Sequence, residues 1–240
     1  MLFKRYQFNR FLGYLMINRI ILFLSFTVLF WFGCTKENNA PDIDLLSEFY
    51  PLKVGSVLIY QVDSTAYSNF TNTSTNFSFE LKDSIVNSFS DLTGATNYRI
   101  ERFKRNTSTE PWVFKQVYTR NKTIRAGEEF IDNQRFIRLV FPPLVGTRWN
   151  GNSKNTLGAI EYIVENEISP LTINNLNFDS TVVVTEVNET NLIREDVVYT
   201  TYAKNIGLIK KDVTAVDKNI SSGRITNGTK FVMEVKSYKN

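Results

Sequence analysis

Residues 229–239 read TKFVMEVKSYK, and this stretch decides the fold class. Phe231, Met233 and Val235 take every second position, and Glu234 lies between two of them. Successive side chains of a β-strand point to opposite faces, so the pattern predicts a strand with one packed face and one wet face.

Similar strand-like stretches precede this one along most of the chain. We expect strands over residues 57–67, 76–86, 96–103, 111–119, 130–141, 159–168, 180–187, 195–205 and 207–217. Residues 96–103 and 111–119 are expected to form a long hairpin, with a bulge before Phe103. Helical patterns are few, and the best is a turn or two over residues 44–49.

Many long strands with short turns predict a mainly β protein. We expect a single strongly curved antiparallel sheet, either a half-barrel or barrel-like, with little helix. Four basic residues lie close together in the stretch RIERFKRN, and we interpret them as charges that protect an exposed sheet edge. They are Arg99, Arg102, Lys104 and Arg105.

The first 33 residues have the pattern of a secretory signal peptide. Four basic residues and no acidic residue occur there, and residues 20–32 are apolar apart from Ser25 and Thr27. This run of 13 residues is short for a membrane-spanning helix, which needs about 20. Met16 opens a compact signal of its own, so either Met1 or Met16 is the expected start.

The apolar run ends on Gly33 and Cys34, and Cys34 is the one cysteine of the chain. This ending resembles the lipobox of bacterial lipoproteins, although Trp31 and Phe32 depart from the usual pattern. Phrases such as YPLKVGSVLIYQVDST also resemble uncharacterised β-rich lipoproteins of the Bacteroidota. The resemblance implies a lipid on Cys34 and a place in the cell envelope. The expected membrane is the outer membrane, and the resemblance does not indicate on which of its two faces the protein lies.

The expected domain organisation follows from this resemblance. Residues 1–33 are the expected signal peptide, residues 34–43 a polar tether, and residues 44–240 a single β-rich domain. Without residues 1–33 the chain has 24 basic and 24 acidic residues, so nucleic acid is not an expected partner. The expected partners are the membrane, through the lipid, and either an envelope protein or an apolar ligand.

Catalytic chemistry has few candidates in this sequence. The chain has no histidine, which removes the common metal ligand and the usual proton shuttle. We find no catalytic residue, no metal site and no cofactor motif. Glu128 and Glu129 are adjacent and should point to opposite faces, and Glu161, Glu165 and Glu167 are expected on a solvated face.

Aromatic residues are the candidate ligand-binding groups. Trp149, Tyr162 and Tyr202 are the chosen three, and Trp112 and Tyr199 are further candidates, with core packing as the alternative for all five. Three triplets resemble the Bacteroidota O-glycosylation pattern of Asp, a hydroxyl residue and a methyl-bearing residue. Their candidate acceptors are Ser64, Ser84 and Ser180.

The sequence leaves three functions open. The first is a non-catalytic binding module for an apolar or lipid-like ligand, which requires a large pocket lined by apolar and aromatic side chains. The second is an interaction subunit of an outer-membrane uptake or surface-assembly complex. The third is a glycan-active hydrolase with paired carboxylates.

Overall fold

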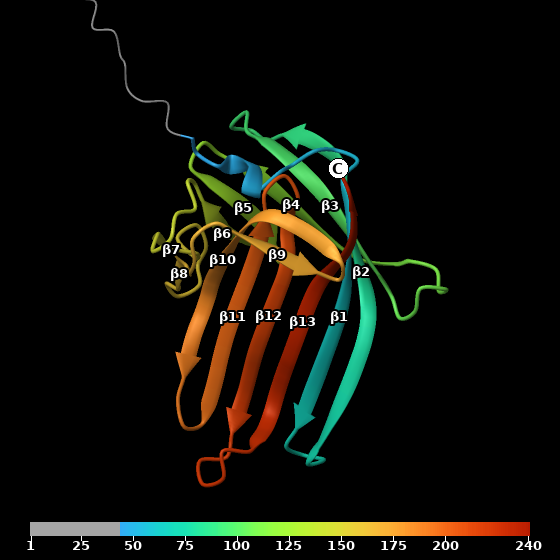
Figure 1. The fold of residues 1–240 in the computed structure, drawn as a ribbon, viewed down its shortest axis with the longest axis vertical. Coiled ribbons are helices and arrows are strands. Elements are labelled where there is room, and N and C mark those ends of the chain that lie inside the picture. The colour runs from blue at the N-terminus through green and yellow to red at the C-terminus, as the bar shows by residue number, and fades with distance from the viewer. Residues whose placement is uncertain (1–43) are drawn as a thin grey trace, which may run out of the picture. The chain divides into compact units, whose positions relative to one another are not determined.

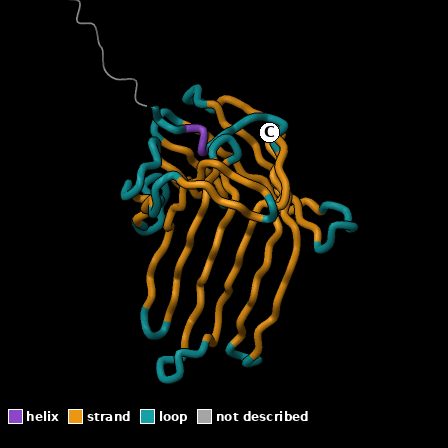
Figure 2. The backbone as a smooth tube through the Cα atoms, viewed as in Figure 1, coloured by secondary structure: helices purple, strands orange, loops and turns teal. Residues whose placement is uncertain are grey.

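The structure is a computed structural model and describes residues 44–240. It contains one 3₁₀ turn and one antiparallel sheet of 13 strands (Figures 1 and 2). The first elements are η1 (Ser47–Phe49), β1 (Val57–Ser68), β2 (Thr73–Ser90), β3 (Thr96–Arg105), β4 (Val113–Lys122), β5 (Ala126–Ile131) and β6 (Gln134–Val140). The others are β7 (Arg148–Asn150), β8 (Glu161–Val164), β9 (Ser169–Ile173), β10 (Leu176–Thr190), β11 (Arg194–Ala203), β12 (Gly207–Lys218) and β13 (Ile225–Lys239).

The sheet curves until its two ends nearly meet. The strand order is β6-β5-β4-β3-β2-β1-β13-β12-β11-β10-β8-β7, and β9 pairs with β10 outside this path. At the seam between β6 and β7, the Ile137 N–H donates to the Gly151 carbonyl at 2.9 Å. The Trp149 indole Nε1 donates to the Ile137 carbonyl, also at 2.9 Å. The expected curved, barrel-like antiparallel sheet is therefore confirmed.

The segment around η1 fills one end of the barrel-like part. Phe49 and Tyr50 are buried there, within a cluster that also contains Tyr202. A side chain at residue 127 would place Cβ only 2.4 Å from the Tyr50 ring, so Gly127 makes room for this ring. We call residues 44–52 the plug.

The last strand, β13, has the alternation that the sequence predicts. Met233 and Val235 are buried in the core, Phe231 packs against the same cluster, and Glu234 is half-buried on the other face. The expected hairpin of β3 and β4 is also present, with an irregular register between Arg102 and Phe103.

Beyond the barrel-like part the sheet continues as a single layer formed by β2, β1, β13, β12, β11 and β10, in the lower halves of Figures 1 and 2. We call this layer the panel and define it as residues 63–79, 187–198 and 212–232. Its side chains are mostly exposed or half-buried, in contrast to the buried residues above it.

Two local expectations were wrong. Residues 130–141 contain two strands, because Asp132 and Asn133 adopt positive φ and turn the chain between β5 and β6. The basic residues around Arg102 do not protect an edge, since β3 lies between β2 and β4. Arg102 is instead paired with the buried carboxylate of Asp83 at 2.6 Å.

Candidate functional site

A cavity of about 260 Å³ lies inside the curved sheet, between Tyr50 of the plug and Phe231 of the panel. Aromatic and apolar side chains share its wall with six charged ones. The charged residues are Arg102, Arg120, Glu129, Arg138, Glu186 and Lys211. The lining therefore differs from the apolar and aromatic pocket that the sequence led us to expect.

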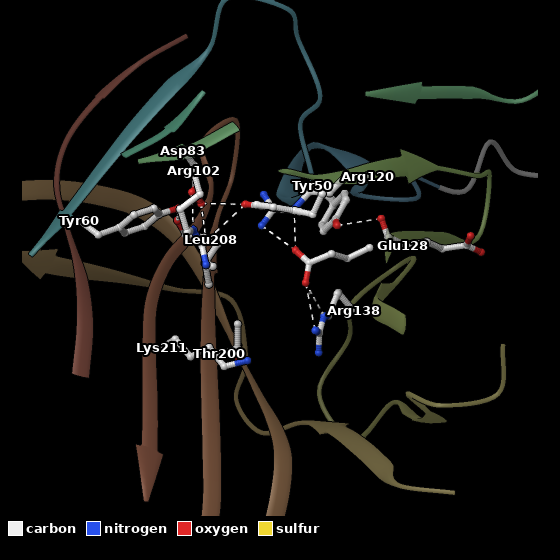
Figure 3. A network of polar contacts seen from close by, with 12 residues as sticks. Tyr50, Tyr60, Asp83, Arg102, Arg120, Glu128, Arg138, Thr200, Leu208 and Lys211 are labelled. Carbon is white, nitrogen blue, oxygen red and sulfur yellow. Dashed lines mark hydrogen bonds and ion pairs between the residues drawn. The ribbon is translucent and has the colours of Figure 1, made fainter. Parts of the chain in front are cut away.

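Arg138, which is labelled in Figure 3, links the acidic residues Glu129 and Glu186 of the cavity. Its Nη2 lies 3.0 Å from Glu129 Oε1, and its Nη1 lies 3.4 Å from Glu186 Oε2. Lys211 Nζ donates to Glu186 Oε2 at 3.0 Å, and Thr200 Oγ1 donates to Glu186 Oε1 at 2.6 Å. Strands from both ends of the sheet are thus held together by charge.

Arg120 and Arg102 form the other side of the network, which Figure 3 shows beside Tyr50. Arg120 donates through Nε to Glu129 Oε2 at 2.9 Å, and its guanidinium lies 5.2 Å from the centre of the Tyr118 ring. The Tyr118 hydroxyl donates to Asp83 Oδ2 at 2.8 Å. Arg102 is fixed by the same carboxylate, so these four groups position each other.

The carboxylates of the cavity are held in the ionised form. Burial alone would raise the pKa of Glu129, but Arg138, Arg120 and Arg102 outweigh it and lower the pKa to about 2. Burial would also raise the pKa of Glu186, but Lys211 and Arg138 outweigh it and lower this pKa below its ordinary value. Both carboxylates are therefore hydrogen-bond acceptors near neutral pH.

The three predicted ligand-binding aromatics lie near the cavity but have different surroundings. Tyr202 lines the cavity and is buried. Tyr162 lies behind it, where its hydroxyl accepts from Arg138 Nη1 at 3.2 Å. Trp149 packs edge-on against Tyr162 with ring centres 5.7 Å apart and bridges the seam. The structure brings Tyr162 and Trp149 together as support for the cavity wall.

The other two aromatic candidates lie away from the cavity. Trp112 is contacted by Arg105, whose guanidinium carbon is 4.2 Å from the ring centre, and by Lys82. Tyr199 of β11 is 37% exposed, on the face opposite to Thr200 and therefore outside the cavity.

The predicted modification sites remain predictions. Ser64, Ser84 and Ser180 are half-buried residues within β1, β2 and β10. Cys34, the predicted signal peptide and the predicted tether lie outside the described residues.

The acidic residues that the sequence singled out have the expected orientations. Glu128 contacts Arg135 and Lys154 on one face of β5, while Glu129 contacts the cavity on the other. Glu161, Glu165 and Glu167 are exposed. Among residues 44–240, no three acidic side chains gather in a geometry that would hold a metal ion.

The grouping of the charged cavity residues was missed because each one lies in a different strand. A signal was present, since Glu186 follows Val182 and Val184 at the spacing of a packed face, and Arg120 follows Tyr118 in the same way. A charged residue at a core position indicates a buried polar network or a site. Only the fold shows that these positions meet.

Comparisons with solved structures give distant likenesses, including the two that follow. A "putative lipoprotein" from Parabacteroides distasonis has a TM-score of 0.43 and 9% identity, over 80% of this chain and 98% of that chain. A "putative exported protein with YmcC-like fold" from Bacteroides fragilis has a TM-score of 0.44 and 10% identity, over 80% and 99%. No protein-family model and no curated protein matches the chain. Likenesses this distant say nothing about ligand or partner.

None of the helical segments in the described part of the chain has the length and apolar character needed to cross a membrane.

Proposed function

We propose that this chain is a non-catalytic envelope protein, lipid-anchored at Cys34 in the outer membrane, that binds an amphipathic anion in its cavity. The observation that carries the proposal is a cavity with an excess of positive charge that adjoins an apolar sheet face. This proposal keeps the lipid-like ligand expected from the sequence and adds a negative head group to it.

The charge excess comes from counting the buried network. Three acidic groups take part, namely Glu129, Glu186 and the Asp83 bound to Arg102. Four cationic groups face them, namely Arg102, Arg120, Arg138 and Lys211. An excess positive charge in a medium of low dielectric constant favours a bound anion.

Lys211 is the cation best placed to meet a ligand. Its ammonium group has three protons, and it donates one hydrogen bond, to Glu186. Its side chain is 24% exposed, whereas that of Arg138 is 15% exposed and forms ion pairs with two carboxylates. A carboxylate or other anionic oxygen is therefore expected to bind at Lys211.

An apolar surface begins directly beyond Lys211. Lys211 is paired with Met233 across β12 and β13, and the next pair on the same face is Val213 with Phe231. Val198 continues this row on one side, and Phe77 continues it on the other side across Ser64. These side chains are half-buried or exposed, so an alkyl chain that covers them would remove apolar area from water.

Binding of dodecanoate to the full chain, measured by isothermal titration calorimetry, tests the proposal. Dodecanol has the same alkyl chain without the charge, and acetate has the charge without the chain. We expect dodecanoate to bind more tightly than both. Lys211→Met should weaken binding of dodecanoate by roughly tenfold and leave dodecanol unchanged.

Lys210→Met is the matched control, because Lys210 is the neighbouring residue on the opposite face and pairs with Glu234 at 2.9 Å. Equal binding of dodecanoate and dodecanol, or equal effects of the two lysine variants, would refute the proposed site. Labelling with a palmitate analogue, with Cys34→Ala as the control, tests the anchor separately.

The proposal of a non-catalytic role is supported by the pKa values of the cavity acids. Glycoside hydrolysis requires one carboxylic acid that is still protonated when it meets the leaving group. Both Glu129 and Glu186 have lowered pKa values, so they suit ion pairing rather than proton donation. The hydrolase is therefore the weaker hypothesis.

A further inference from the structure

Residues 73–79 of β2 form a sheet edge that has no neighbouring strand among the described residues. All seven residues pair with β1 on one side. On the other side, β3 begins to pair with β2 only at Glu80. Figure 1 shows this part of β2 as the outer margin of the panel. Unpaired N–H and C=O groups along such a margin are a template for another strand.

This margin lacks the features that usually protect an edge. Its sequence, TSTNFSF, has no charged residue, no proline and no glycine. The opposite margin of the panel, residues 187–190 of β10, contains the charged Glu189. The ends of the sheet at β6 and β7 are bridged to each other through Ile137. The β2 margin is thus an open and uncharged edge of the described sheet.

The seven residues are self-complementary when two copies run antiparallel about Asn76. Thr75 then lies opposite Phe77 of the second copy, and Ser74 lies opposite Ser78. Thr73 in the same way meets Phe79. Pairs of an aromatic with a β-branched residue are favourable across antiparallel strands. Phe77 is 51% exposed in the single chain, so it gains contacts in this arrangement.

We propose that two copies of this chain associate through residues 73–79 of β2 and form one continuous antiparallel sheet. A two-fold axis at Asn76 presents the same patch from each copy, which is the usual symmetry of a homodimer. Residues 34–240 contain equal numbers of acidic and basic residues, so net charge does not oppose the association.

The register predicts a specific cross-link. At the axis, the two copies of residue 76 are directly opposite, with Cα atoms about 4.5–5.5 Å apart as in any antiparallel pair. This separation suits a disulfide bond. We expect Asn76→Cys in the full chain, solubilised in detergent, to give a disulfide-linked dimer on mild oxidation, in which two thiols lose two electrons and two protons to the added oxidant.

Two controls accompany this measurement. Asn188→Cys places a cysteine on the opposite margin at another exposed asparagine, and the parent chain holds Cys34 alone. Neither is expected to give the cross-linked dimer. Phe77→Lys introduces a charge at an exposed position of the edge, and it should weaken association in sedimentation velocity by about tenfold.

Several results would overturn the proposal. The first is a parent chain that remains monomeric at all concentrations. The second is a dimer that persists in Phe77→Lys and that does not become cross-linked in Asn76→Cys. Cross-linking of Asn76→Cys to a different protein in place of a second copy would also overturn it. Phe77 also belongs to the apolar row beside the cavity, so Phe77→Lys is not used to test ligand binding. Dodecanoate binding to the parent chain and to Lys211→Met tests the proposed function, and cross-linking of Asn76→Cys tests the association.

Discussion

Glu129 is the anion that Arg120 and Arg138 of the buried network share, and Glu129→Gln tests what this anion contributes to stability. The carboxylate accepts from Arg120 and Arg138 and is almost completely buried. Its pKa falls from 4.5 to about 2 in the folded protein. This difference corresponds to roughly 3 kcal/mol of stabilisation at neutral pH. The variant keeps the side-chain volume but leaves two buried guanidinium groups without their shared anion, which also predicts a loss of about 3 kcal/mol or more.

The assay is equilibrium unfolding in urea at pH 7, with the free energy of unfolding extrapolated to zero denaturant. Glu161→Gln is the matched control, because Glu161 pairs with Arg148 at the surface and both side chains are more than half exposed. Exposed ion pairs contribute about 0–1 kcal/mol. If Glu129→Gln loses no more stability than Glu161→Gln, the network does not stabilise the fold in the way argued above.

Three further predictions concern the same fold. The pKa of Glu129 is lowered on folding, so its contribution is complete above about pH 4.5 and is lost as the pH falls towards 2. Urea titrations over this pH range should show a steep fall in the free energy of unfolding for the parent chain and a shallower fall for Glu129→Gln. Trp149→Phe removes the indole donor to Ile137 and should cost about 1 kcal/mol, seen as a lower urea midpoint. Gly127→Ala forces Cβ into the Tyr50 ring, so it should lower the melting temperature and increase the exposure of the plug to proteolysis. A melting temperature equal to that of the parent chain would show that the plug can move aside.

The strands could be predicted from the sequence because alternation is a local property. In β13, Met233 and Val235 are buried as the pattern requires. The same rule placed Glu128 and Glu129 on opposite faces of β5. The rule failed where one pair of residues changed the chain direction, as at Asp132 and Asn133, since positive φ at both positions leaves no mark in the hydrophobic pattern.

The candidate site could be predicted only in part. Tyr202 was chosen as an aromatic and does line the cavity, while Trp149 and Tyr162 support its wall. The meeting of the charged groups in one cavity was not predicted, and Arg102 was assigned to an exposed edge. Its true partner, Asp83, lies 19 residues away on the neighbouring strand, and nothing in the local sequence of either residue indicates the pairing.

The sequence by itself determined the mainly β fold, the faces of most strands and the lack of histidine chemistry, because these depend on residue type and spacing of two. Only the tertiary structure decided that Glu129 of β5, Glu186 of β10 and Lys211 of β12 share one cavity. Their meeting depends on how far the sheet curves, and curvature results from twist and bulges summed over all strands. The panel is a single layer that does not close, and there the margin of β2 has no neighbouring strand among the described residues.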